Sequence, residues 1–277
     1  MDWLTEPLTS YAFFGRAMLA LLLAGAICGA LGAYVVVRRM SYIAHGLSHS
    51  VIGGAAVAGV LGLNLLLGAA AWALLSALLI DRVGRRRGLY PDTAIGIVTT
   101  ASFALGIAII SSVRGIRLNL ESFLFGSILG VTTVDLVLAA VVAVAVAAAL
   151  LVAYRPLLFC TFDPAVASAH GIAVGRYEAL LAVLLTAGVV ASMRVLGVLL
   201  VAAAVVIPPA TARLLTDRFD RMLPLAAGLG AGAAVPGLYA SWYLDIAPGP
   251  AVVLTQTAVL TLVWARVAVR QRLLTAA

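Results

Sequence analysis

The stretch AMLALLLAGAICGALGAYVVV, residues 17–37, decides the fold class of this chain. It runs for 21 residues without a charged side chain. A helix of about 20 apolar residues is long enough to cross a bilayer. Arg38 and Arg39 follow the run directly, where a cleavable signal peptide would have small residues. We therefore expect the run to be a membrane anchor that stays in the chain.

The rest of the chain repeats this pattern, since 64% of the 277 residues are hydrophobic and only 10% are charged. In lipid, backbone polar groups must pair with each other, which leaves helices or closed barrels. Long Ala, Leu and Val runs favour helices. We predict an all-α membrane protein, residues 1–277 forming a single transmembrane domain. Its nine spans lie at about 15–37, 43–63, 65–80, 93–112, 133–154, 177–192, 195–210, 223–242 and 250–267.

The count falls to eight if residues 177–210 form a single bent element, because only Ser192-Met-Arg194 interrupts that stretch. Arginine accounts for all 18 basic residues and determines the orientation, because basic residues accumulate in cytoplasmic loops. An external N-terminus and a cytoplasmic C-terminus place 14 of them inside. These are Arg38, Arg39, Arg82, Arg85, Arg86, Arg87, Arg155, Arg176, Arg213, Arg218, Arg221, Arg266, Arg270 and Arg272. Such short clusters between apolar runs indicate topology rather than a nucleic-acid surface.

Two stretches do not span. Residues 111–130 carry Glu121 and an amphipathic segment, and we place them at the outer mouth. Residues 154–177 form a cytoplasmic loop in which Asp163, Pro164, His170 and Gly171 outline a two-turn helix, with Asp at the N-cap, Pro at the first position and Gly past the end. A short capped helix there would suit docking of a partner; an ordinary connecting loop is the alternative.

His45 and His49 are the best indication of cargo, because the chain has only one other histidine. Residues four apart lie on the same face of a helix, so the two imidazoles can converge on one metal ion. Imidazole suits zinc, copper, nickel and iron. Two ligands are too few for a structural zinc site, so we expect a transient stop during transport. The alternative is that both histidines only bond backbone or water where the helix bends.

An enzymatic function has little support. A zinc protease motif would have Glu after the first histidine, where this chain has Gly46. A Walker A loop needs lysine, which the chain lacks, so any ATP must be bound by another polypeptide. An ion-coupled secondary transporter would need carboxylates inside the membrane, and all acidic residues fall near predicted span ends. Cys28 and Cys160 are interpreted as packing residues.

Polar and proline residues mark several span ends. Pro208 and Pro209 should stop or kink the seventh span and so leave Arg213 at the inner surface. Asp92 is interpreted as the N-cap of the fourth span. Asp135 and Asp245 should be solvated at outer span ends.

Several sequence blocks together resemble one family. His45-Gly-Leu-Ser-His49-Ser-Val-Ile-Gly-Gly is similar to the Asp-Ala-Leu-Ser-His-Ala motif of the membrane permeases of ABC importers for zinc, manganese and iron(II). Asp92-Thr-Ala-Ile-Gly-Ile-Val, Glu121-Ser-Phe-Leu-Phe-Gly and the stretch 197–213 also resemble that family's blocks, in its order. The chain departs from the family in having His45 where aspartate is common. The vitamin B12 importer's membrane subunit, of the type II importers, is more distantly similar.

The resemblance implies a homodimer with the path between protomers, a separate ABC ATPase, an extracytoplasmic metal-binding protein, and a prokaryotic cytoplasmic membrane. It implies that His45 and His49 coordinate the passing metal, and that the loop with Asp163, Pro164, His170 and Gly171 transmits ATPase motion. No cofactor is expected to be stably bound. A nitrogen in place of an oxygen at position 45 favours zinc, with manganese or iron(II) as the alternative.

Overall fold

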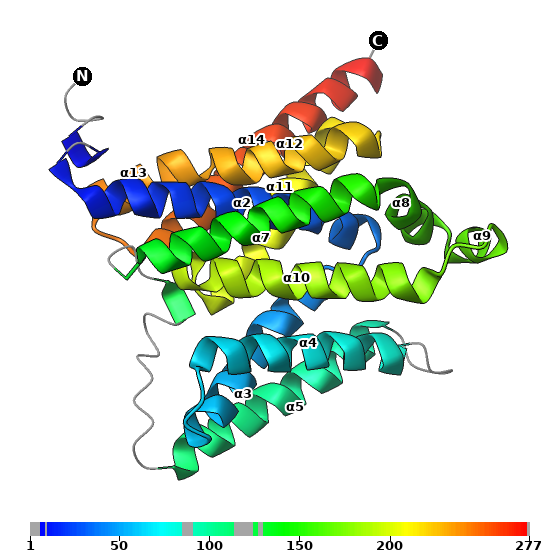
Figure 1. Cartoon of the computed structure of the whole chain (residues 1–277). Helices are drawn as coiled ribbons and strands as arrows, with labels where there is room; N and C mark the ends of the chain where they lie inside the picture. The colour runs from blue at the N-terminus through cyan, green and yellow to red at the C-terminus, as the bar shows by residue number, and fades with distance from the viewer. Residues whose placement is uncertain (1–5, 9, 85–90, 114–123, 127–129, 276–277) are drawn as a thin grey trace.

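The computed structural model describes residues 6–8, 10–84, 91–113, 124–126 and 130–275. Every regular element within these residues is helical (Figure 1). The helices, labelled as in Figure 1, are α2 (Ala12–Val37), α3 (Tyr42–Val60), α4 (Leu65–Gly84), α5 (Pro91–Ser112), α7 (Thr133–Val152), α8 (Tyr154–Phe162), α9 (Pro164–Ala169), α10 (Val174–Leu196), α11 (Val198–Leu215), α12 (Phe219–Gly232), α13 (Ala234–Leu244) and α14 (Pro248–Thr275). The prediction of an all-α protein is confirmed.

Nine segments of the described chain are long and apolar enough to cross a membrane. Eight of these segments are single helices, and the remaining one, Phe219–Leu244, combines α12 and α13. Pro236 explains that break, because it cannot donate a hydrogen bond to the carbonyl of Gly232, the last residue of α12. The nine predicted spans are confirmed.

Gly197 decides between eight and nine spans. Helix α10 continues through Ser192 and Arg194, the expected point of interruption, and ends two residues further on, at Leu196. Gly197 then takes φ +85° and ψ 148°, and α11 begins at the next residue. A side chain there would overlap the carbonyl oxygen of Leu124 and the backbone of Phe125, so both the conformation and the space require glycine.

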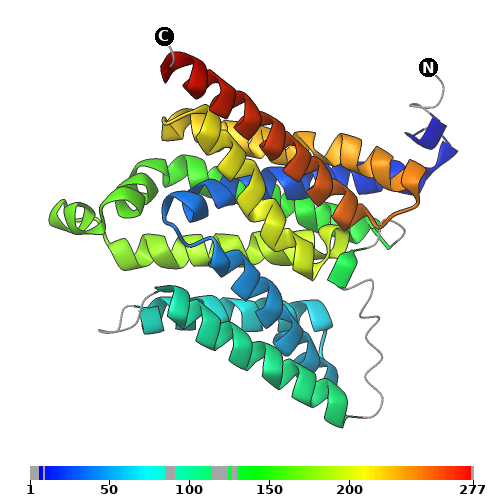
Figure 2. The same ribbon diagram turned by 180° about the vertical axis from the view of Figure 1, so that it is seen from behind.

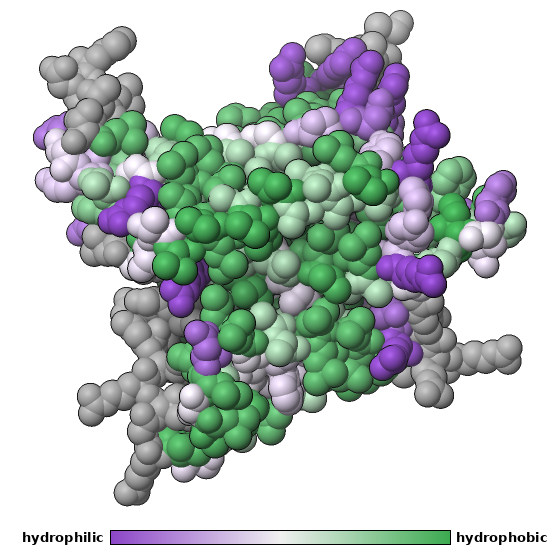
Figure 3. All heavy atoms as spheres, in the orientation of Figure 1, coloured by the Kyte–Doolittle hydropathy of each residue, from purple (hydrophilic) through white to green (hydrophobic). Residues whose placement is uncertain are grey.

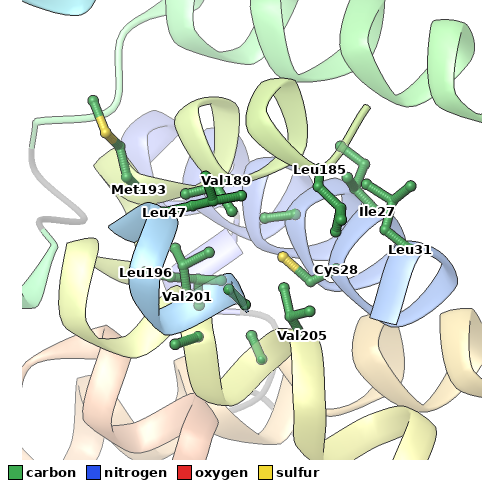
Figure 4. Packing of buried hydrophobic residues seen from close by; sticks show 14 of the residues in the cluster. Ile27, Cys28, Leu31, Leu47, Leu185, Val189, Met193, Leu196, Val201 and Val205 are labelled. Atoms are coloured by element: carbon green, nitrogen blue, oxygen red, sulfur yellow. The ribbon is translucent and has the colours of Figure 1, made fainter. Parts of the chain in front are cut away.

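Helix α2 forms the centre of the larger group of helices and packs on α7, α10, α11 and α12. In Figure 4, Ile27, Cys28 and Leu31 of α2 meet side chains from α10 and α11, among them Leu185 and Val205. Lipid is as apolar as these side chains, so close packing rather than exclusion of water holds such helices together. Cys28 and Cys160 are both free and buried, and burial raises the pKa of the Cys160 thiol. The interpretation of both as packing residues agrees with this.

Helices α3, α4 and α5 form a second group (Figures 1 and 2). This group contacts the first through α3, which packs on α10 and α11, and through α4, which packs on α10. The outer helices expose apolar side chains: in the most apolar part of α14 only 11% of the residues are buried, against 67% in α2. Figure 3 shows hydrophobic residues over the middle of one face and hydrophilic residues towards its left and right ends. This distribution is that of a protein surrounded by a bilayer.

Asp135 is not solvated, contrary to our expectation. Its carboxylate is 7% exposed and accepts hydrogen bonds from Thr132 N (3.0 Å), Thr132 Oγ1 (2.7 Å) and Arg194 Nη1 (2.8 Å). The Thr132 hydroxyl in turn accepts from Asp135 N, which completes a capping box at the start of α7. Asp135 thus ties the start of α7 to the end of α10. The expectation was wrong because Arg194 lies 59 residues away in the sequence.

Candidate functional site

His45 and His49 lie on one face of α3 and face each other. Their Nε2 atoms are 3.1 Å apart and their ring centroids 4.4 Å apart. The contact is a hydrogen bond in which one imidazole donates and the other accepts, so the accepting ring is neutral at that nitrogen. Two nitrogens at this separation, each roughly 2.0–2.1 Å from a zinc ion, would subtend an angle of about 98°. The pair is therefore close to the geometry in which both rings bind one ion.

The pair opens into a pocket of about 400 Å³ between α3 and α5. Residues between positions 42 and 49 of α3 and between positions 92 and 103 of α5 line it: Tyr42, His45, Gly46, His49, Asp92, Ile95, Gly96, Thr99, Thr100 and Phe103. The Phe103 ring packs edge-on against His49, with centroids 5.1 Å apart. His45 is exposed and His49 partly buried, so both imidazoles can be reached from the pocket.

Gly46 sets the width of this pocket. A Cβ atom at position 46 would lie 2.6 Å from Thr99 Oγ1 and 3.0 Å from Ile95 Cγ2, so only glycine lets α3 approach α5 this closely. No three His, Cys, Asp or Glu side chains in the described part of the chain lie close enough together to hold one metal ion. Within the described residues the pair itself offers two nitrogen ligands.

The predicted capped helix is present as α9, which projects from the bundle (Figure 1). The Asp163 carboxylate accepts hydrogen bonds from Ala165 N and Val166 N, both at 3.0 Å, and Pro164 is the first helical residue. His170 is the C-cap and its Nδ1 lies 2.9 Å from the Val166 carbonyl oxygen. Gly171, at φ +76°, ends the helix: its N–H donates to Ser168 and the next N–H donates to Ala167. The local structure follows the sequence pattern; a role in coupling stays a prediction.

Of the two outcomes predicted for Pro208 and Pro209, a stop or a kink, the stop is wrong. Helix α11 continues through both prolines to Leu215, and both are buried. Each proline removes one helical hydrogen bond, and packing of α11 against α2, α12, α14 and α3 compensates for the loss. Arg213 does lie in the last turn, where it donates to the Asp217 carbonyl at 3.1 Å. Glu121 and most of the predicted outer segment 111–130 lie outside the described residues.

Asp92 and Arg38 have positions that the sequence did not suggest. Asp92 follows Pro91 inside the first turn of α5, so it is not the N-cap, and it lines the histidine pocket. Arg38 closes α2 and donates from Nε to Thr161 Oγ1 of α8 at 3.1 Å. Burial lowers the pKa of Arg38, an effect that the nearby charges of Glu178 and Asp81 oppose. Arg38 thus connects the end of α2 to α8, a contact that its interpretation as a topology signal does not include.

Comparison with known proteins places the chain. Residues 10–266 match the ABC 3 transport family. The chain is 38% identical over 257 residues to "Manganese transport system membrane protein MntC" of Halalkalibacterium halodurans, covering 93% of this chain and 88% of the relative. It is 37% identical to "Probable iron transport system membrane protein" of Haemophilus influenzae, covering 93% and 90% of the two chains.

Among solved structures, a chain of PsaBC from Streptococcus pneumoniae in complex with Fab has a TM-score of 0.84 and 32% identity, covering 94% of each chain. A putative metal-chelate type ABC transporter in an inward-facing conformation shares the fold, with a TM-score of 0.72 at 17% identity. The family match and these relatives each cover nearly the whole of the nine-span chain. The chain is a multi-pass membrane permease and belongs to the ABC 3 transport family.

Proposed function

We propose that this chain is the membrane subunit of an ATP-driven importer of divalent transition metals, and that His45 and His49 bind the metal as it passes. The observation that carries the proposal is the pair itself: two imidazoles 3.1 Å apart that line an open pocket at the start of two spans. Relatives named for manganese and iron transport support a metal cargo. Two ligands bind an ion less firmly than the four of a structural zinc site, which suits transport.

The surrounding assembly follows from the same family. We propose a homodimer of type II importer architecture in a prokaryotic cytoplasmic membrane, with the path between protomers, a separate ATPase on the cytoplasmic side and a metal-binding protein outside. The arginine pattern predicts that the N-terminal ends of α3 and α5 lie on the cytoplasmic side. The same pattern predicts this side for the projecting α9. Glu121 would lie at the outer mouth.

The metal itself has two candidates. Two imidazole nitrogens favour zinc, because carboxylate oxygens suit manganese better. The relatives named for manganese and iron favour those metals instead. The zinc proposal therefore depends on His45, where the family commonly has aspartate.

Exchanging His45 for aspartate tests this point. We expect His45→Asp to lower zinc uptake about tenfold relative to manganese uptake, because an oxygen replaces a nitrogen ligand. Uptake of both radiolabelled metals would be measured in cells that express the permease with its ATPase and binding protein. An unchanged ratio of zinc to manganese would show that position 45 does not set selectivity.

We also propose that α9 seats on the ATPase. It is exposed along most of its length, and Phe162 (61% exposed) and Val166 (40%) present apolar surface beside it. Exposed apolar side chains on a polar end of a membrane protein indicate a protein partner. A helix of six residues is not stable in isolation, so its shape depends on the two caps.

Removing the N-cap of α9 should weaken the coupling of ATP hydrolysis to metal transport. Asp163→Ala loses both capping hydrogen bonds, worth about 1 kcal/mol, so metal transported per ATP hydrolysed should fall about fivefold. Asp163→Ser retains a capping oxygen and is the matched control. Proteoliposomes containing the permease and its ATPase give both rates, and equal ratios for the Ala and Ser variants would argue against coupling through α9.

The same proteoliposomes distinguish the proposal from an ion-coupled secondary transporter. An importer driven by ATP should move metal only when the ATPase and ATP are present. Metal movement by the permease alone, driven by a proton or sodium gradient, would contradict the proposed function.

A further inference from the structure

We propose that Asp92 forms a second transient metal-binding site, which the ion passes as it moves from the histidine pair towards the cytoplasm. This inference rests on the function proposed above. It is carried by the register of α3 against α5, which places Asp92 and the two histidines in one pocket in a fixed order.

Contacts between the two helices define that order. His49 lies beside Phe103, and position 46 lies against Thr99 and Ile95. Asp92 comes one turn earlier in α5 than Ile95, about 4.5 Å nearer the beginning of the helix. The metal-binding side chains along the pocket therefore follow in the order His49, His45, Asp92 towards the N-terminal ends of both helices. In the proposed orientation that end faces the cytoplasm.

The α5 side of the pocket is a single face of the helix. Asp92, Ile95, Thr99 and Phe103 recur at helical spacing and all line the pocket. The pocket volume of about 400 Å³ exceeds the roughly 30 Å³ of one water molecule many times, so a partly hydrated ion fits. An ion that leaves the histidines towards this end passes Asp92.

The Asp92 carboxylate is available for such a role. It is exposed, and it forms no hydrogen bond or ion pair with another described residue. It lies in the first turn of α5. Asp92 and the two histidines do not form a three-ligand cluster in the described chain. Their separation supports two successive metal-binding sites rather than one shared site.

The chemistry of Asp92 also bears on selectivity. A carboxylate oxygen suits manganese, whereas the imidazoles suit zinc. Loss of the carboxylate should therefore affect manganese more than zinc. If Asp92 served only to stabilise the start of α5, both metals would be affected equally.

The test measures uptake of radiolabelled manganese and zinc, per permease molecule in the membrane, in cells that express the whole transport system. We expect Asp92→Asn to lower manganese uptake about tenfold and zinc uptake distinctly less, and Asp92→Glu to restore manganese uptake. Asp217→Asn is the matched control, because that carboxylate is 97% exposed and does not line the pocket. It should behave as wild type.

Wild-type uptake of both metals by Asp92→Asn would overturn the inference, and so would an equal loss of both that Asp92→Glu does not restore. If Asp92→Asn fails to accumulate in the membrane, the manganese to zinc ratio of Asp92→Ser decides by the same criterion. His49→Ala is included to separate the two proposals. Normal uptake by that variant contradicts the proposed function, whereas normal uptake by Asp92→Asn beside a defective His49→Ala contradicts only this inference.

Discussion

His49→Ala should lower metal uptake at least about tenfold, and up to about 100-fold. The substitution leaves His45 as the only imidazole in the pocket, and a single side-chain ligand cannot replace the waters that a divalent ion loses on entering. The nitrogen that is removed lies 3.1 Å from the His45 nitrogen, so the two act as one binding unit in the proposed path. Uptake by cells with the complete transport system measures the effect.

Two further variants separate ligation from packing. His49→Asp and His49→Asn remove the same edge contact with Phe103 and have nearly the same shape, but only aspartate brings an ionised oxygen. We expect His49→Asp to retain part of the manganese uptake and His49→Asn to lose it. If His49→Ala transports both metals within twofold of wild type, the ion does not pass this pair.

Asp135→Ala should destabilise the protein by about 2–4 kcal/mol. The buried carboxylate accepts from the backbone and hydroxyl of Thr132 and from Arg194, and alanine removes all three bonds. It also leaves the start of α7 without its capping box and Arg194 without its partner. Thermal unfolding of the purified permease in detergent would measure the loss.

Asp217→Ala is the control for this change, since Asp217 is 97% exposed and lies 3.6 Å from Arg213. Exposed pairs of that kind contribute at most about 1 kcal/mol, so its unfolding temperature should stay close to that of wild type. The double variant Asp135→Ala/Arg194→Ala should lose less stability than the sum of the two single variants. Additive losses would show that the two side chains do not interact.

Much of the fold could be predicted because it is encoded locally. Each membrane span is a continuous apolar run, so length and composition suffice to find it. The short helix α9 was predictable for the same reason, because Asp163, Pro164 and Gly171 start and end the helix through contacts with residues one or two turns away. The facing of His45 and His49 follows from the helical period alone.

The errors concern residues whose role depends on a distant partner. Asp135 appeared solvated because its partner Arg194 is 59 residues away. Pro208 and Pro209 appeared to end a helix because the packing that stabilises it comes from other helices. Asp92 appeared to be a cap because nothing in its own neighbourhood reveals the pocket that it shares with α3.

The sequence by itself determined the membrane class, a count of eight or nine spans, and the histidine pair. Apolar runs reveal the spans, and a helix fixes the relation between residues three or four positions apart. Only the tertiary structure decided that Asp92 lies beyond that pair and that Gly197 separates two spans. The reason is physical. The packing of whole helix surfaces determines which side of a helix contacts its neighbour and at what position along the axis. No single stretch of the chain contains that information.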